Sequence, residues 1–120
     1  YLVKFSEKIP GRFVENQHNK SSLVKVITLK SFIKDYQIDS VDFLKCDCEG
    51  AEYEIFANLE ACVFEKIKVI SLEFHDLKNA NFSGLRLLDL FKKRGYESLA
   101  FQYLPSRMGL NYGRLVVRKP

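Results

Sequence analysis

Two apolar segments constrain the fold of this chain more than any other feature. They are VDFLKC at 41–46 and IKVISLEF at 67–74, and each has the length of one buried strand. Apolar residues recur at helical spacing in the stretches before, between and after them. Alternation of strand and helix is typical of a parallel sheet that is covered by helices on both faces. The sequence therefore predicts an α/β fold.

Three helices are expected around these strands. The first covers LKSFIKDYQ and has Thr28 as its N-cap. The second begins at Glu49 or Gly50, and the third is capped by Ser83 and stopped by Gly95. The second helix is expected to bury one stripe of side chains, made of Ala51, Ile55, Leu59 and Cys62.

The rest of the chain completes one domain. Residues 1–22 are rich in polar and turn-forming side chains and are expected to form a loop-rich lead-in, with a strand at 23–28 after them. YESLAFQY and GRLVVRK are expected to pair as a closing antiparallel hairpin, because Pro105 and Gly109 lie between them. A length of 120 residues suits a single core, so residues 1–120 are expected to be one domain.

Charge and composition restrict the possible partners. The net charge of +4 is scattered, and its densest run, 92–94, lies at the end of a predicted helix, where cations are favoured. No basic and aromatic side chains interleave as in RNA-binding surfaces, and no apolar run approaches the roughly 20 residues of a membrane span. Because no leader follows Tyr1, we expect a cytoplasmic protein without nucleic-acid or membrane partners, cut from a longer chain.

The three cysteines do not suggest a metal site. Cys46, Cys48 and Cys62 contain no C-x-x-C pair, so zinc binding is not expected. We expect Cys46 and Cys48 to point to opposite faces at the strand end, which would disfavour a disulfide between them. Reduced thiols also fit a cytoplasmic protein.

Polar side chains follow both apolar strands. Asp47 comes directly after 41–46, and Glu73 and His75 end the second strand. Because ligands of parallel sheets bind at the carboxyl ends of the strands, these residues are candidates for chemistry. Asp47 has the chemistry to orient a cofactor amine, accept a proton or bind a divalent cation, or it is an exposed loop carboxylate.

Glu73 and His75 have two possible interpretations. Either they work together as a catalytic base or as metal ligands, or Glu73 is a buried glutamate and His75 lies at the rim. Glu49 and Glu52 lie near a helix start, where helix electrostatics favours a carboxylate, and Gly50 permits close backbone approach or an unusual φ in the turn. The chain contains neither G-x-G-x-x-G nor a P-loop, which excludes the common nucleotide fingerprints.

The spacing of these residues resembles that of a known family. LKCDCEGAE contains K-x-D-x-E-G-x-E, VISLEFH ends in E-x-H, and LLDLFKKRGY ends in Gly-Tyr. Together with the preceding LKSFI helix, these features resemble the core of the FkbM-type methyltransferases over residues 24–101. The matching residues are Leu29, Phe32, Ile33, Lys45, Asp47, Glu49, Gly50, Glu52, Glu73, His75, Gly95 and Tyr96.

The resemblance implies the carboxyl-terminal half of a class I, Rossmann-like methyltransferase fold: a mostly parallel sheet with a closing antiparallel hairpin. It implies an S-adenosylmethionine cofactor and transfer of methyl to a hydroxyl of a small molecule or glycan, with no dedicated metal site, although Mg²⁺ assistance stays open. Asp47, Glu73 and His75 would then be catalytic. Asp47, Glu49 and Gly50 would bind the cofactor.

One departure from the family pattern is large. The family's glycine-rich cofactor loop and ribose-binding acid belong to its first three strands, and residues 1–22 do not contain them. We therefore expect these 120 residues to be inactive alone, and the alternative is a non-catalytic α/β remnant that serves as a structural or interaction module. Strand 41–46 would be an exposed edge, expected to pair in a homodimer or with the missing amino-terminal half.

Overall fold

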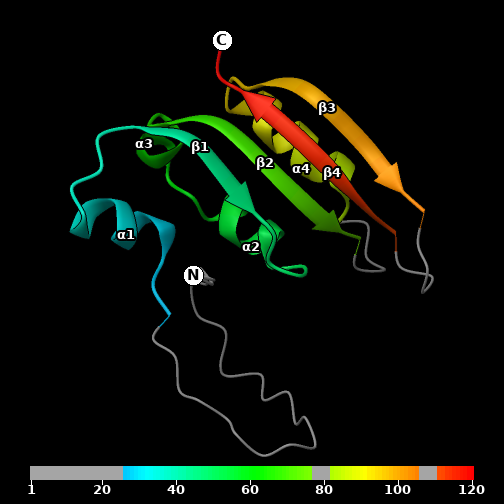
Figure 1. The fold of residues 1–120 in the computed structure, drawn as a ribbon, viewed down its shortest axis with the longest axis horizontal. Coiled ribbons are helices and arrows are strands. Elements are labelled where there is room, and N and C mark those ends of the chain that lie inside the picture. The colour runs from blue at the N-terminus through cyan, green and yellow to red at the C-terminus, as the bar shows by residue number, and fades with distance from the viewer. Residues whose placement is uncertain (1–25, 77–81, 106–110) are drawn as a thin grey trace, which may run out of the picture.

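A computed structural model describes residues 26–76, 82–105 and 111–120 of the chain (Figure 1). None of the helices in these ranges has the length and apolar character needed to cross a bilayer. The elements are α1 (Leu29–Asp35), β1 (Val41–Cys46), α2 (Glu52–Ala57), α3 (Ala61–Phe64), β2 (Ile67–His75), α4 (Gly84–Lys93), β3 (Glu97–Leu104) and β4 (Tyr112–Arg118).

The four strands form one mixed sheet in the order β1-β2-β4-β3. β1 and β2 are parallel, whereas β4 is antiparallel to both β2 and β3. The expected antiparallel hairpin is confirmed, but the expectation of a mostly parallel sheet is wrong for the described strands. The reason is that β4 inserts between β2 and β3, so the hairpin adds two antiparallel pairings to a single parallel one.

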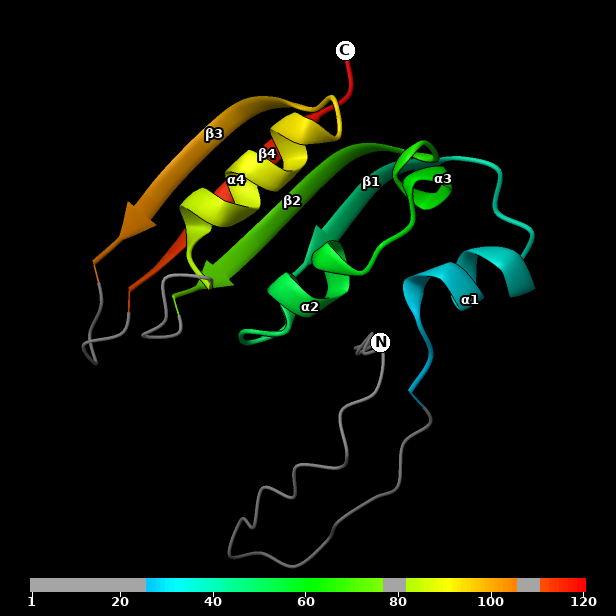
Figure 2. The same ribbon diagram turned by 180° about the vertical axis from the view of Figure 1, so that it is seen from behind.

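Helices α2, α3 and α4 lie on one face of the sheet, and α1 lies off its β1 edge (Figures 1 and 2). In the described part of the chain no helix covers the opposite face, which corrects the expectation of helices on both faces. Phe43 is 59% exposed, and it shares a register position with Val69 of β2. The sheet therefore has one face buried under α2, α3 and α4, and a second face that no described helix covers.

The core lies between the sheet and the helices. Alternate residues of β2, namely Ile70, Leu72 and Phe74, are buried, because successive side chains of a strand point to opposite faces. On the helix side Phe56 and Phe91 meet edge to face, with ring centroids 4.9 Å apart. Burial of such rings is the main source of stability in a small domain.

Two predicted helix ends are confirmed, and the described part of one predicted strand is wrong. Thr28 caps α1, since its hydroxyl accepts a hydrogen bond from Ser31 N at 3.0 Å, and Gly95 follows α4 with a φ of 83°. Residues 26–28 form no strand, and the remainder of the expected strand at 23–28 lies outside the described residues, as does the 1–22 lead-in.

The single helix expected after Gly50 is two short helices, α2 and α3, separated by an extended Glu60. The expected stripe is wrong only at Cys62, which is exposed, because Leu59 is buried and Ala51 and Ile55 pack against the core. Tyr53, Phe56, Val63 and Phe64 are buried as well. The break at Asn58–Glu60 rotates α3 relative to α2, so a single helical period does not describe both.

Candidate functional site at the carboxyl ends of β1 and β2

The parallel pairing of β1 and β2 brings two polar strand ends to one edge of the sheet. Their register runs from Val41 opposite Ile67 to Cys46 opposite Leu72. The residues after Cys46 therefore lie beside the last residues of β2. This edge is where open α/β sheets bind ligands.

Three of the predicted residues form a contact cluster. His75 Nε2 lies 3.6 Å from Glu49 Oε2 and 3.9 Å from Glu73 Oε1. The His75 side chain is only 19% exposed, whereas that of Glu49 is largely in solvent. The imidazole is a candidate proton acceptor at this edge, and the two carboxylates lie on either side of its Nε2 atom.

The surroundings of His75 hold its ring in place. The ring stacks on Tyr112 of β4, with centroids 6.1 Å apart and planes 14° from parallel. Glu73 is held by Arg114, whose Nε lies 3.7 Å from Glu73 Oε2. His75 Nδ1 is buried without a hydrogen-bond partner among the described residues, so the ring retains one unused polar atom at the site.

Asp47 lies at the same edge but outside this cluster. Its Oδ2 is 3.9 Å from Lys45 Nζ, and the side chain is 38% exposed. Among the ion pairs of the described residues, none joins Asp47 to His75. The structure thus brings together Glu49, Glu73 and His75 and leaves Asp47 as a separate, accessible carboxylate.

The turn after β1 has an unusual backbone. Glu49 has a φ of 53° and Gly50 a φ of 100°, so the expected unusual φ at Gly50 is confirmed. Glu49 is not the helix cap that its position suggested, because α2 begins only at Glu52 and no helix N–H bonds to Glu49 among the described residues. Its left-handed backbone directs its side chain toward His75.

Glu52 is the residue that sequence analysis underestimated. Its side chain is fully buried and accepts hydrogen bonds from Cys48 N at 2.7 Å and Gly50 N at 2.9 Å. The carboxylate therefore fixes the turn that carries Asp47 and Glu49. The motif K-x-D-x-E-G-x-E ends at Glu52 and so marked this residue in the sequence. Its place in the first turn of a predicted helix, however, suggested only a favourable interaction with the helix dipole.

The two cysteines that flank Asp47 are in contact. Cys46 Sγ and Cys48 Sγ are 3.7 Å apart and both side chains are buried. The expectation that they point to opposite faces is wrong, because residues two apart in an extended chain lie on the same side. The contact places a thiol pair directly under the candidate site.

Asp76 has a structural part at the end of β2. Its Oδ1 accepts hydrogen bonds from Gly84 N at 2.9 Å and from the Tyr53 hydroxyl at 3.4 Å. Burial and the neighbouring Asp76 carboxylate raise the pKa of Tyr53 above its ordinary value.

Within the ranges that the structure covers, no group of three or more His, Cys, Asp or Glu side chains is arranged to hold a metal ion.

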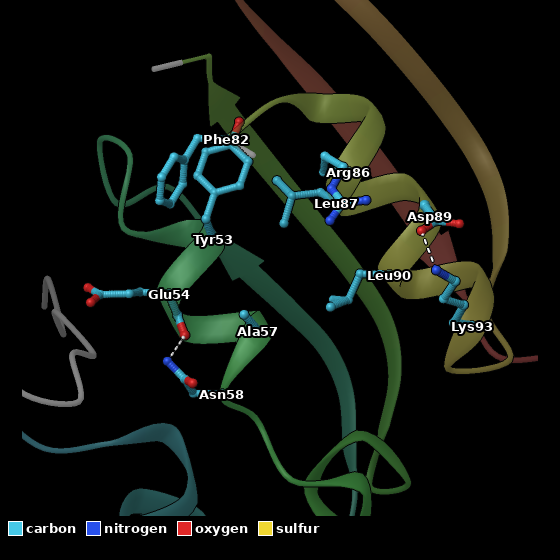
Figure 3. Close-up of a pocket in the computed structure, with 10 residues that line it drawn as sticks. All are labelled: Tyr53, Glu54, Ala57, Asn58, Phe82, Arg86, Leu87, Asp89, Leu90 and Lys93. Carbon is cyan, nitrogen blue, oxygen red and sulfur yellow. Dashed lines mark hydrogen bonds and ion pairs between the residues drawn. The ribbon is translucent and has the colours of Figure 1, made fainter. Parts of the chain in front are cut away.

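A hollow of about 300 Å³ lies elsewhere, between α2 and α4 (Figure 3). It contains none of the predicted site residues. In Figure 3 the rings of Tyr53 and Phe82 lie at one end of the hollow, and Lys93 lies at the other. Its lining residues are Tyr53, Glu54, Ala57, Asn58, Phe82, Arg86, Leu87, Asp89, Leu90 and Lys93.

Comparison with known proteins adds a family to this geometry. The sequence model of the methyltransferase FkbM domain matches residues 4–98, which is more than half of the chain. The chain belongs to the FkbM methyltransferase domain family. The resemblance seen in the sequence motifs is thereby confirmed, and residues Asp47, Glu49, Glu73 and His75 all lie within the matched FkbM region.

A curated relative of this FkbM domain is the AMB antimetabolite synthetase AmbE of Pseudomonas aeruginosa. The two are 30% identical over 71 residues, which make up 58% of this chain and 3% of that protein. The chain therefore spans a very small part of the relative. No solved structure gives a significant match.

Proposed function

We propose that this FkbM domain is part of a methyltransferase that transfers methyl from S-adenosylmethionine to a hydroxyl oxygen of a small molecule or glycan. Membership of the family supports methyl transfer. The parallel β1–β2 pair, whose strands are connected through α2 and α3, supports a Rossmann-like arrangement of this part of the fold. Three free thiols support a cytoplasmic location.

The cluster of Glu49, Glu73 and His75 is the observation that carries the proposal. A hydroxyl becomes a better nucleophile when a base accepts its proton during transfer. His75 is the candidate for that base, because its Nε2 faces the edge of the sheet between two carboxylates. Glu73, held by Arg114, would stabilise the resulting imidazolium.

The carboxylates at this edge fit one end of the proposed cofactor. S-adenosylmethionine, when bound, supplies an electrophilic methyl group. Asp47 and Glu49 are exposed acceptors suited to its ammonium group, and the backbone at Gly50 permits close approach. The described residues contain no glycine-rich loop for the adenosine end, which supports placing that part of the site outside them.

Titration calorimetry with S-adenosylmethionine tests this proposal. Asp47→Asn should weaken binding about tenfold, since loss of one charge-assisted contact is worth roughly 1.4 kcal/mol. Asp42→Asn is the matched control, because Asp42 is an exposed carboxylate within β1, five residues before Asp47, and pairs with Lys68 instead. The titration is made on this chain and on any longer protein of which it is part.

The outcome separates the two functional hypotheses. Binding that is weakened by Asp47→Asn and unaffected by Asp42→Asn supports the methyltransferase. If no form of the protein binds S-adenosylmethionine, the proposal fails and a structural or interaction module is favoured. Tight binding by the 120 residues alone would contradict the expectation that the cofactor site needs further chain.

We further propose that the β1 edge is an association surface. In the described sheet β1 pairs only with β2, so its outer backbone groups are free to pair with another strand, and Phe43 is exposed beside it. The chain should therefore form dimers as its concentration rises, measured by sedimentation velocity. A monomer at all concentrations would contradict this, and Phe43→Lys should weaken the association.

A further inference from the structure

The thiols of Cys46 and Cys48 form a close pair at the base of the turn. Cys46 is the last residue of β1, and Cys48 lies two residues further, before the backbone turns at Glu49 and Gly50. Their sulfur atoms are 3.7 Å apart, and the two residues are 6% and 9% exposed. The pair does not contribute to the methyl transfer proposed above.

The two thiols are electrostatically different. A hydrogen bond from Cys46 lowers the pKa of the Cys48 thiol to about 7, although burial and the nearby Glu52 and Asp47 carboxylates oppose the shift. The same hydrogen bond, together with burial, raises the pKa of Cys46 far above its ordinary value. At neutral pH Cys48 thus has nucleophilic thiolate character, and Cys46 keeps its proton.

We propose that Cys46 and Cys48 are a reversible dithiol–disulfide pair, oxidised by exchange with a low-molecular-weight disulfide such as oxidised glutathione. The inference rests on the contact between the two sulfur atoms and on their position around Asp47. Disulfide formation closes a small ring that contains Asp47. The backbone of that residue is then fixed in the oxidised state.

The exchange proceeds in two balanced steps. The Cys48 thiolate attacks one sulfur of glutathione disulfide, forming a mixed disulfide and releasing one glutathione thiolate, which takes up a proton. Cys46 then loses its proton to solvent and attacks the Cys48 sulfur, which expels the second glutathione. Two protein thiols and one glutathione disulfide thereby become one protein disulfide and two glutathione thiols.

Bond formation requires a local movement of the two sulfur atoms. A disulfide needs a sulfur separation of about 2.05 Å, so the sulfur atoms must approach by roughly 1.7 Å. Cys46 is held in the sheet opposite Leu72, whereas Cys48 lies in the turn after β1. The movement therefore falls on the Cys48 side chain, because the Cys48 backbone N–H is held by Glu52.

Intact mass measurement in a Cys62→Ser background tests the proposal. Cys62 is the exposed thiol, and its removal prevents disulfides between chains through that residue. After incubation with oxidised glutathione at neutral pH, the mass should fall by two hydrogen atoms, and dithiothreitol should restore it. A peptide map should show residues 46 and 48 linked within one chain.

Single-cysteine variants identify the attacking thiol. In the same background, Cys46→Ala should accumulate a stable glutathione adduct on Cys48, because no partner remains to expel it. Alkylation of Cys48 by iodoacetamide should have a midpoint near pH 7 when Cys46 is present, and Cys46→Ala should raise it. Circular dichroism confirms that the variant is folded.

Two results would overturn the inference. One is an unchanged mass after oxidation, and the other is a lasting glutathione adduct while Cys46 is still present. Neither measurement depends on S-adenosylmethionine or on methyl transfer. Failure of the thiol pair and failure of the proposed function are therefore distinguishable.

Discussion

Replacement of Gly113 by alanine should destabilise this domain more than any other single methyl addition to a described glycine. A Cβ at this position would lie 2.2 Å from the backbone oxygen of Gln102 and 2.5 Å from Cζ of Phe74. The backbone oxygen is fixed, because Gly113 lies near the start of β4, where β4 is paired with β2 on one side and with β3 on the other. We expect a loss of about 3 kcal/mol in the free energy of unfolding, typical of severe overpacking.

Urea unfolding followed by circular dichroism measures this loss, and the melting temperature should fall by on the order of 10 °C. Gly95→Ala is the matched control. A Cβ at Gly95 meets nothing within 4 Å, so the substitution adds only the strain of its φ of 83°, about 1 kcal/mol. Equal destabilisation by the two variants would show that Gly113 does not lie as close to the Gln102 backbone and the Phe74 ring as the structure indicates.

Replacement of His75 by glutamine should lower kcat for methyl transfer by about 10²–10⁴-fold, the usual contribution of a general base. Glutamine retains a polar end near Glu73 but does not take up a proton at neutral pH. Binding of S-adenosylmethionine should change little, since the substitution retains both proposed ammonium acceptors, Asp47 and Glu49, and glutamine keeps a polar group beside Glu49. The measurement is transfer of a labelled methyl group together with calorimetric titration, in the active protein that contains this domain.

Asp42→Asn again serves as the control for this experiment. Its carboxylate is exposed and pairs with Lys68, so both kcat and cofactor binding should stay within about twofold of the wild type. If His75→Gln binds the cofactor and transfers methyl at the wild-type rate, His75 is not the base. Loss of cofactor binding together with kcat would instead indicate a disturbed turn.

The sequence was informative where local physical rules act alone. The strands 41–46 and 67–74 were predicted because short apolar runs bounded by polar residues are typical of buried strands. Thr28 and Gly95 mark helix ends because a capping hydroxyl and a left-handed backbone are local requirements. K-x-D-x-E-G-x-E indicated the family, which the match over residues 4–98 confirms.

Helical periodicity failed where the helix itself is interrupted. Cys62 was placed on a buried stripe because the pattern after Gly50 fits one helix, yet the chain breaks before α3 and exposes this residue. Glu52 was assigned to helix electrostatics, although it is buried and holds the turn. Burial of a carboxylate depends on what packs over it, and that is not a local property.

The sequence by itself determined the α/β class, the two polar strand ends and the presence of Glu73 and His75 on one strand face. Only the tertiary structure decided that β4 inserts between β2 and β3, that Glu49 reaches His75, and that the thiols of Cys46 and Cys48 touch. The physical reason is that strand order and turn geometry arise from long-range packing. The backbones of Gly84 and Gly113 both lie against the Phe74 ring, where a Cβ atom would collide with it. These two glycines are far apart in the chain, so no local pattern encodes the contact.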